Sequence, residues 1–461
     1  MRVATRRVLL TGVAMAAVVA AQATLGRAGE GDPPKAPRFV VHEWGTFTSV
    51  QGQDGVALDG LSREEEALPD FVYDRTKIRD CPLRAQGWKG LEVPAEHVTQ
   101  KMETPVIYFH SATQRRVRVR VDFVKGLLSQ WYPVADLLGP AEGALGAAPL
   151  DVAKVDRSFL QWDIDVLAPG PGAKRPVEVP MVAPDDPWAF AREVDANWVR
   201  TVARKRPERA GPVEAEKYLF YRGIGNFTVP LRAGMWQDDD IVVSNDGDVA
   251  IQGAIAFEIR GEKGRVTQVD TIPAGGATKV TLQGGDWWGP IDDVDRKLQA
   301  FVHERLVKQG LFDDEARAMV RTWSRSWFRA EGTRVLWIVP RATVDAILPL
   351  SIDPKPDDLV RVLVGRAEVI PPRVEREDYA ALLDSINDHQ PEVAARVLPW
   401  IERRGRFLEP HLRNVLAGIE RRAAAKTPDA DDAAVRSRIE RWLEKLKRTD
   451  EAGASGGAVG R

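Results

Sequence analysis

Apolar and polar residues alternate over several short segments in the first half of the chain, which is typical of strands with one buried face. Within residues 117–123, valines alternate with charged residues. An apolar run at 103–110 precedes this segment, and the polar stretch 111–116 joins the two. The pattern predicts a β-hairpin with one face in water.

Short alternating runs continue through residues 215–285, separated by turns that contain glycine. Turn signals at such short spacing are typical of a β-sandwich, so we expect a sandwich-like module at 215–285. Stretches rich in proline and glycine lie within 170–215 and should interrupt regular structure. The β-rich body, which we place at 29–370, could therefore be split there.

The hydrophobic period changes to that of helices after residue 290. Val294 and Leu298 recur at helical spacing, and a second stripe contains Trp323 and Trp327. From Arg376 onward three further apolar stripes follow, which predicts a helical bundle at 371–446. The fold class is thus predicted as α+β, with a β-rich body and a helical C-terminal bundle. Residues 447–461 are expected to be a disordered tail.

The N-terminus has the composition of an export signal. A basic start with Arg2, Arg6 and Arg7 is followed by an Ala- and Val-rich stretch with small residues at the expected cleavage points. We expect residues 1–28 to be removed, leaving no stable transmembrane anchor and a periplasmic or secreted protein. The paired arginines also fit the twin-arginine route, which would favour folding, and loading of any metal, before export.

Composition excludes some partners. With 65 basic and 67 acidic residues, the chain has no net field that would attract nucleic acid. Cys81 is the single cysteine, so no intrachain disulfide can form, and a small buried side chain is its expected role. The partner is therefore expected to be an unknown ligand or a protein of the cell envelope.

The segment 39–47 reads as a strand that carries ionisable residues. On a period of two, Glu43 shares one face with Val41, whereas His42 shares the other face with Trp44. Both faces are partly apolar, so each ionisable group needs a partner from elsewhere in the fold. His42 and Glu43 should therefore not act as an adjacent pair.

A second strand repeats this pattern. Glu103 enters its apolar run on the face of Ile107, and His110 leaves it on the face of Tyr108. If the two strands are neighbours, Glu43 and Glu103 could converge as catalytic carboxylates, or with an arginine or a metal.

In the same arrangement His42 and His110 could converge as ligands of a divalent metal. No HExxH spacing is present, so a structural hydrogen-bonding role is favoured over the metal site.

Further charged residues lie beside apolar runs later in the chain and are predicted to form ion pairs within the body. They are Glu315, Arg341, Asp345, Arg366 and Glu368.

Several motifs, taken together, resemble those of a family of exported bacterial proteins without an assigned function. They are HEWGTFTSV, METPVIYF, FYRGIGNF, EARAMVRTWSRSWF and IVPR, and the resemblance covers about residues 39–370. It implies an exported protein but no particular reaction.

Two hypotheses follow for the function. The first is a binding or interaction protein of the cell envelope, because no complete catalytic motif accompanies the many strands and the 14 tryptophans. The alternative is a metal- or carboxylate-dependent hydrolase centred on His42, Glu43, Glu103 and His110.

Overall fold

A ten-stranded sheet lies at the centre of the fold in the computed structural model, which describes residues 38–63, 68–75, 95–141, 150–169, 175–202, 212–282, 288–387 and 391–455. Its strand order is β18-β16-β15-β19-β21-β1-β4-β12-β6-β2. In chain order these strands are β1 (Phe39–Gln51), β2 (Tyr73–Asp74), β4 (Gln100–Ser111), β6 (Gly126–Tyr132), β12 (Leu219–Gly225), β15 (Ile251–Arg260), β16 (Lys263–Ile272), β18 (Gly289–Pro290), β19 (Gly332–Ile338) and β21 (Asp358–Val369).

The strand β1 lies inside this sheet, parallel to β21 and antiparallel to β4. All 13 of its residues are buried, as expected for a strand with apolar side chains on both faces. Val41 and Phe47 point into one apolar core, and Trp44 points into another. The sheet therefore separates two cores.

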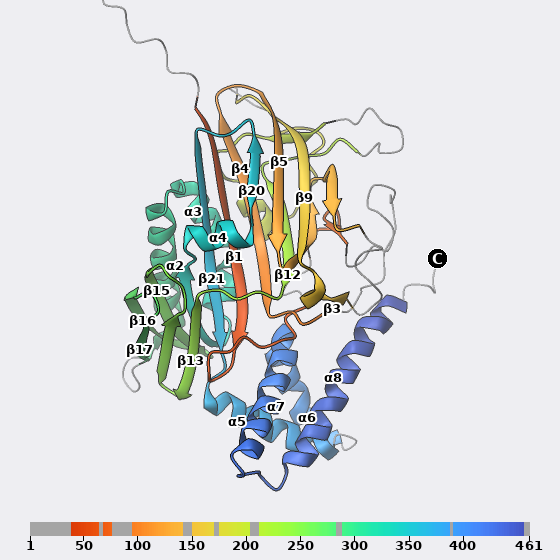
Figure 1. The fold of residues 1–461 in the computed structure, drawn as a ribbon, viewed down its shortest axis with the longest axis vertical. Helices are drawn as coiled ribbons and strands as arrows, with labels where there is room; N and C mark the ends of the chain where they lie inside the picture. Colours follow the sequence, from red (N-terminus) through yellow and green to blue (C-terminus); the bar gives the residue numbers. More distant parts are fainter. Residues whose placement is uncertain are drawn as a thin grey trace, which may run out of the picture. The chain divides into compact units, whose positions relative to one another are not determined.

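Two smaller sheets share the first core with the central sheet (Figure 1). One has the order β11-β10-β9-β5-β20 with β7 paired to β9, and the other has the order β13-β14-β17. The bounds are β5 (Arg115–Val124), β7 (Leu137–Gly139), β9 (Arg157–Val166), β10 (Val199–Thr201), β11 (Ala215–Glu216), β13 (Leu231–Gln237), β14 (Asp240–Asn245), β17 (Ala277–Thr281) and β20 (Leu350–Asp353). A short parallel pair joins β3 (Ala95–Glu96) to β8 (Leu150–Asp151), ahead of a 3-10 turn, η2 (Val152–Lys154).

Helices cover the other face of the central sheet and fill the second core. They are α1 (Pro187–Ala191), α2 (Ile291–Lys308), α3 (Asp313–Trp323) and the π-helical turn η4 (Ser324–Phe328). The predicted stripes are the buried faces of α2 and α3, since Val294, Leu298, Trp323 and Trp327 all belong to this core. A further helix, α4 (Arg341–Ile347), packs into the first core instead.

The predicted hairpin of residues 103–123 is wrong. β4 and β5 follow one another in the chain but belong to different sheets, where β4 pairs with β1 and β12 and β5 pairs with β9 and β20. The difference in pattern explains this separation. β4 is apolar on both faces and can lie inside the central sheet, whereas β5 buries Val117 and Val119 and exposes Arg118, which suits an outer layer.

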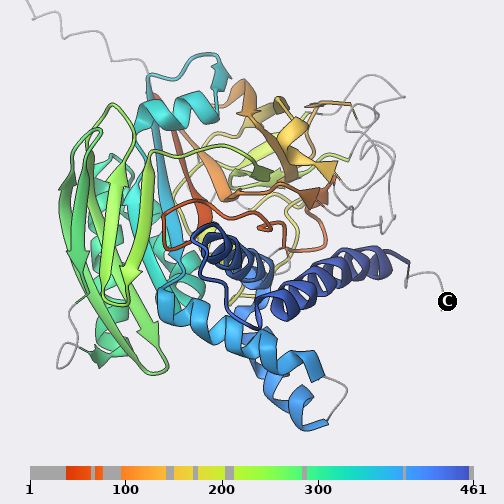
Figure 2. The ribbon, with the colours of Figure 1, turned by 60° about the horizontal axis from the view of Figure 1, so that its bottom comes forward.

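The strands of residues 215–285 are shared between sheets (Figure 2). β12, β15 and β16 belong to the central sheet, while β13, β14 and β17 form a layer that packs against it through the first core. Two layers thus face each other, and both lie in the compact unit that contains the rest of the body. Strands on both sides of the stretch 170–215 likewise share one sheet.

The predicted C-terminal bundle consists of α5 (Pro372–Asp384), α6 (Pro391–Arg404), α7 (Leu408–Ala424) and α8 (Asp432–Ser455), with 3-10 turns η5 (Ser385–Asn387) and η6 (Gly405–Phe407). Its own core includes Leu382, Leu412, Val415, Ile419 and Ile439. α8 continues to Ser455, past the boundary of 446 that the sequence predicts. All the described residues belong to one compact unit.

The fold class is therefore α+β, with a β-rich body and a helical C-terminal region. Among the described residues, no helix has the length and apolar character needed to cross a bilayer. The predicted export signal at 1–28 and Cys81 both lie outside the described residues.

Candidate functional site

The two ionisable residues of β1 point to opposite faces of the central sheet, as predicted. Glu43 faces the first core, where its carboxylate accepts hydrogen bonds from the hydroxyl of Tyr221 and from Nε of Arg361 (2.5 Å). Arg361 also pairs with Asp345 (2.7 Å). Glu43 is fully buried, so this arginine balances its charge.

His42 faces the helices and meets His110 there. β1 and β4 pair so that Val40 lies opposite His110 and His42 lies opposite Tyr108. The two histidines are therefore diagonal neighbours on one face of an antiparallel pair. Their ring centroids are 5.3 Å apart.

Glu315 of α3 joins the two histidines. Its Oε2 lies 2.7 Å from Nδ1 of His42, and its Oε1 lies 2.9 Å from Nε2 of His110. The three ligand-type atoms lie within 4.8 Å of one another. We call these three residues the His–Glu cluster.

The start of α3 fixes the position of Glu315. Its Oε2 also accepts a hydrogen bond from the backbone N–H of Phe312 (2.8 Å), the residue before the helix, as in a capping box. Burial raises the pKa of Glu315, but the hydrogen bonds from His110 and His42 outweigh burial and lower the pKa below its usual value. Glu315 is therefore ionised at neutral pH.

The ring of Phe312 lies against both imidazoles, 4.4 Å from that of His42 and 4.8 Å from that of His110 between centroids. Phe312 is 45% exposed, whereas the side chain of His110 is 16% exposed and that of His42 only 2%. One aromatic ring thus lies between the His–Glu cluster and solvent.

Glu103 does not lie on the face that the sequence predicts. The pairing of β1 with β4 shifts between Trp44 and Thr46, and this bulge moves Glu103 opposite Thr46. Glu103 therefore lies on the helix-covered face with Val106, not with Ile107. The period of two fails here because one extra residue reverses the faces beyond the bulge.

The carboxylate of Glu103 is hydrogen-bonded and lies among positively charged side chains. Its carboxylate accepts hydrogen bonds from Arg406 of η6 and from the hydroxyl of Thr48 (2.6 Å). Burial raises its pKa, but the positive charges of Arg406, Arg366 and Lys101 outweigh burial and hold the pKa well below its usual value. Glu43 and Glu103 lie on opposite faces, so the structure does not bring together the predicted carboxylate pair.

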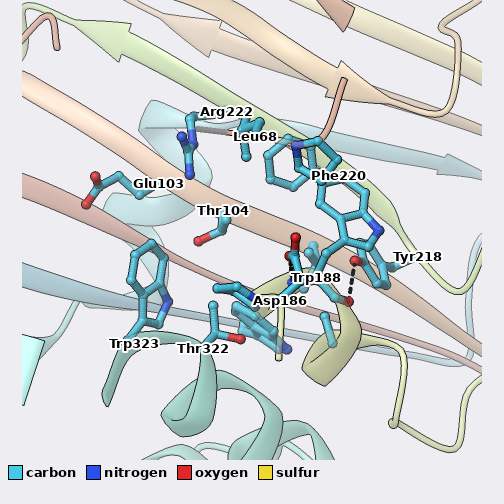
Figure 3. A pocket seen from close by; sticks show the side chains of 15 residues that line it. Leu68, Glu103, Thr104, Asp186, Trp188, Tyr218, Phe220, Arg222, Thr322 and Trp323 are labelled. Atoms are coloured by element: carbon cyan, nitrogen blue, oxygen red, sulfur yellow. Dashed lines mark hydrogen bonds between the residues drawn. The ribbon is translucent and has the colours of Figure 1, made fainter. Parts of the chain in front are cut away.

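A pocket of about 80 Å³ lies beside Glu103 on the same face (Figure 3). A single water needs roughly 10–15 Å³, so the pocket has room for a small ligand group. Its walls come from β1, β4, β12, α1 and α3. They include Trp44, Val106, Trp188, Tyr218, Phe220 and Trp323.

The pocket wall includes buried polar groups that are unsatisfied within the described residues. The hydroxyl of Thr104 and Nε1 of Trp323 are buried and have no hydrogen-bond partner within the described residues. By contrast, Nε1 of Trp188 donates to Glu216 (2.8 Å), and the hydroxyl of Tyr218 donates to the carbonyl of Trp188 (3.2 Å). The residues that line the pocket thus include donors that the protein itself does not use.

Thr104 has an unusual backbone. Its φ is +44°, in the left-handed region that β-branched residues rarely occupy. Pro105 follows it, and the two form the β4 side of the bulge opposite Gly45. A strained residue persists only where the surroundings hold it, and such residues cluster at functional sites.

Two of the predicted ion pairs are present. Arg341 pairs with Asp345 (2.8 Å), and Arg366 pairs with Glu368 (2.7 Å). Glu315 pairs with the histidines instead, and no spacing in the sequence links it to His42 or His110. Thr104 was missed as well, although the Thr-Pro step in METP marks a special backbone position.

No family model matches the chain, and no curated protein matches it. Among solved structures, similarity is found to the mu homology domain of Fcho1 from Danio rerio with a bound Eps15 peptide, at 6% identity and a TM-score of 0.24, covering 72% of this chain and 97% of that one. The yeast delta-COP-I mu-homology domain matches at 6% identity and a TM-score of 0.24, covering 74% and 100%. The complex of that yeast domain with a Dsl1 WxWxV peptide matches at 7% identity and a TM-score of 0.24, covering 73% of this chain and 98% of that one. The resemblance to exported bacterial proteins stays a prediction.

Proposed function

We propose that this protein is a binding protein whose pocket takes a small ligand with one aromatic ring and a carboxylate. The observation that carries the proposal is the strained Thr104, whose buried hydroxyl is unsatisfied in an aromatic pocket. Leaving a buried polar group unsatisfied costs about 1–3 kcal/mol. A ligand that accepts hydrogen bonds would remove this cost.

The walls suit the ring of such a ligand. Trp188 and Phe220 lie 4.8 Å apart between ring centroids, and Trp323 lines the pocket as well. Aromatic rings prefer such offset or edge-on neighbours at about 4.5–7 Å. Specific binding sites commonly combine apolar walls of this kind with a few placed polar groups.

The polar groups suit a carboxylate. Both Thr104 and Trp323 can donate a hydrogen bond, and the guanidinium of Arg222 also lines the pocket. The negative charge of Glu103 is already balanced by Arg406. The carboxylate of Asp186 also lines the pocket, and its Oδ1 accepts a hydrogen bond from the backbone N–H of Trp188. The donors of Thr104 and Trp323 thus favour a ligand with an acceptor group.

The carboxylate-dependent form of the hydrolase alternative has less support. Its two carboxylates, Glu43 and Glu103, are each held by a buried arginine and lie on opposite faces of the sheet. Held in this way, the two carboxylates cannot share acid and base roles with each other. We retain export, and with it an envelope location, as part of the proposal because of the signal-like residues 1–28.

Titration calorimetry with benzoate tests the proposed ligand class. We expect saturable binding, and we expect Thr104→Val to weaken it about tenfold, since it removes one hydrogen bond worth about 1.4 kcal/mol and keeps the shape of the side chain. Trp323→Phe should weaken it at least as much, because it removes a hydrogen-bond donor and part of the aromatic wall. Thr113→Val, at an exposed position away from the pocket, is the matched control. Cyclohexanecarboxylate should bind more weakly because it lacks the aromatic ring.

Two results would contradict the proposal. One is the absence of benzoate binding at millimolar concentration by wild-type protein with a cooperative thermal transition. The other is equal affinity for benzoate in Thr104→Val, Trp323→Phe and the Thr113→Val control.

A further inference from the structure

The structure assigns a second site to the His–Glu cluster: we propose that His42, His110 and Glu315 bind one divalent cation of the zinc class. This inference does not depend on the ligand pocket. Three observations support it: the three side chains meet from distant parts of the sequence, Glu315 has histidines as its partners, and the donor atoms lie close together.

The three residues come together from distant parts of the sequence. His42 lies on β1, His110 on β4 and Glu315 on the first turn of α3. Each donor is positioned by regular structure, because the strand pairing fixes the two histidines and the capping hydrogen bond to Phe312 fixes the glutamate. Sites on such rigid elements hold their ligands accurately.

The charge balance of Glu315 distinguishes it from the other buried glutamates. Among the described residues, each of the other buried glutamates forms an ion pair with an arginine, whereas Glu315 pairs only with histidines. The pairs are Glu43–Arg361, Glu103–Arg406, Glu216–Arg192, Glu258–Arg265, Glu368–Arg334 and Glu375–Arg421. Histidine, unlike arginine, is also a common metal ligand, so this carboxylate has metal-binding side chains as its partners where the others have a guanidinium. The three side chains together thus form a donor set that a divalent cation can use.

The donor set is one that zinc uses. Two imidazole nitrogens and one carboxylate are found in zinc enzymes, where the fourth position is left to water or another ligand. With bonds of about 2.0–2.2 Å, neighbouring donor atoms around a tetrahedral ion lie roughly 3.4 Å apart. The separations of 2.7 and 2.9 Å, each to a different oxygen of Glu315, are shorter than this, and the three ligand atoms lie within 4.8 Å of one another. Shifts of about 1.4 Å or less, which rotation of side chains can provide, bring them to tetrahedral spacing.

Phe312 gives the site a short route to solvent. Its ring covers both imidazoles and is itself 45% exposed, so rotation of this side chain opens the cluster. An apolar cover of this kind also lowers the local dielectric, which strengthens the bond between cation and ligands. The cluster can thus be reached by an ion and shielded once the ion is bound.

Elemental analysis of the full-length protein tests this assignment. Protein purified without affinity tags or chelators should contain about one zinc per chain, and Co²⁺ added to the chelator-treated protein should give the visible absorption of a four-coordinate ion. His42→Ala and Glu315→Gln should each lower zinc affinity at least tenfold. Glu315→Gln preserves the shape of the side chain and therefore guards against a variant that fails to fold.

His411→Ala is the matched control. His411 also pairs with a buried carboxylate, that of Asp378 (2.6 Å), but Arg404 already balances the charge there. This variant should lose stability without losing zinc. Benzoate affinity should be unchanged in Glu315→Gln, because Glu315 lies eight residues, or about 12 Å along α3, from Trp323.

The assignment is overturned if the protein contains no stoichiometric metal and neither Zn²⁺ nor Co²⁺ raises its thermal midpoint. It is equally overturned if Glu315→Gln and His411→Ala retain the same metal content as the wild type. In either case the cluster is a hydrogen-bonded network only, and the proposal for the ligand pocket stands or falls separately.

Discussion

At the scale of single residues, the buried ion pairs are the features with the largest energetic consequences. Glu43 and Arg361 have side chains that are 0% and 1% exposed. Removing one partner of such a pair leaves an uncompensated buried charge, which is far more costly than the loss of a surface pair.

We predict that Glu43→Gln lowers the free energy of unfolding by about 3 kcal/mol, the lower end of the range for buried pairs, because Arg361 keeps its contact with Asp345. Urea denaturation measures the change. Asp163→Asn removes the partner of the exposed Arg118 and should have a much smaller effect. Equal effects of the two substitutions would contradict the role given to Glu43.

The sequence predicts part of the candidate site at this scale. The period of two correctly places His42 and Glu43 on opposite faces, since β1 is regular up to Trp44. The same rule fails for Glu103, because nothing in the pattern reveals the bulge. Glu315 could not be assigned to the histidines, since its contact depends on how α3 packs across the sheet.

At the scale of elements, the bulge between β1 and β4 has a central role. It turns Glu103 toward the helices and places Thr104 in the pocket wall. Gly45 makes it possible: a Cβ on Gly45 would lie 2.8 Å from the Cα of Pro105, closer than side chains tolerate.

Gly45→Ala should therefore destabilise the protein by about 1–3 kcal/mol, the usual cost of overpacking, and should also weaken benzoate binding. Gly289→Ala is the matched control, since a Cβ there meets nothing within 4 Å. Thermal unfolding and calorimetry on both variants give the comparison. A stable Gly45→Ala protein with unchanged binding would show that the bulge does not shape the pocket.

Sequence periodicity predicts the type of most elements but not their partners. The apolar stripes of α2 and α3 are buried as expected, because a helix forms its hydrogen bonds within itself. Strands depend on distant segments. The hairpin expected from β4 and β5 fails for this reason, since each strand pairs with partners far away in the chain.

At the scale of the whole molecule, the body and the helical bundle are predicted from the sequence, but the contacts between them are not. Arg406 of η6 binds Glu103 of β4, and Glu375 of α5 accepts a hydrogen bond from Gln53, just after β1 (2.7 Å). Both contacts join charged or polar groups, which leave no periodic pattern. They connect the bundle to the central sheet.

The pH dependence of stability should report the contact between Arg406 and Glu103. The pKa of Glu103 is lowered in the folded protein from an ordinary value of 4.5, so its contribution is present above pH 4.5 and is lost as the pH falls below that value. Glu103→Gln should therefore be less stable than wild type at pH 7, and the difference should narrow as the pH falls from 5 to 2.

Denaturant unfolding at several pH values measures this difference. Asp358→Asn, at an exposed pair with Arg38, should show a small difference at every pH. If the free energies of unfolding of Glu103→Gln and wild type differ by the same amount at every pH, the ionisation of Glu103 does not contribute to stability as proposed.

The position of β1 in the central sheet determines when its two edges can pair during synthesis of the chain. Its neighbour on one side, β4, follows soon after in the sequence, but on the other side Glu43 meets Arg361, 318 residues later. Among the described strands, β1 is the first to be synthesised, and it gains its second partner only when the last one, β21, has been made. Until β21 has left the ribosome, one edge of an apolar strand has no partner and is open to unwanted association. The growing protein needs protection along that edge while the 318 residues from Glu43 to Arg361 are synthesised.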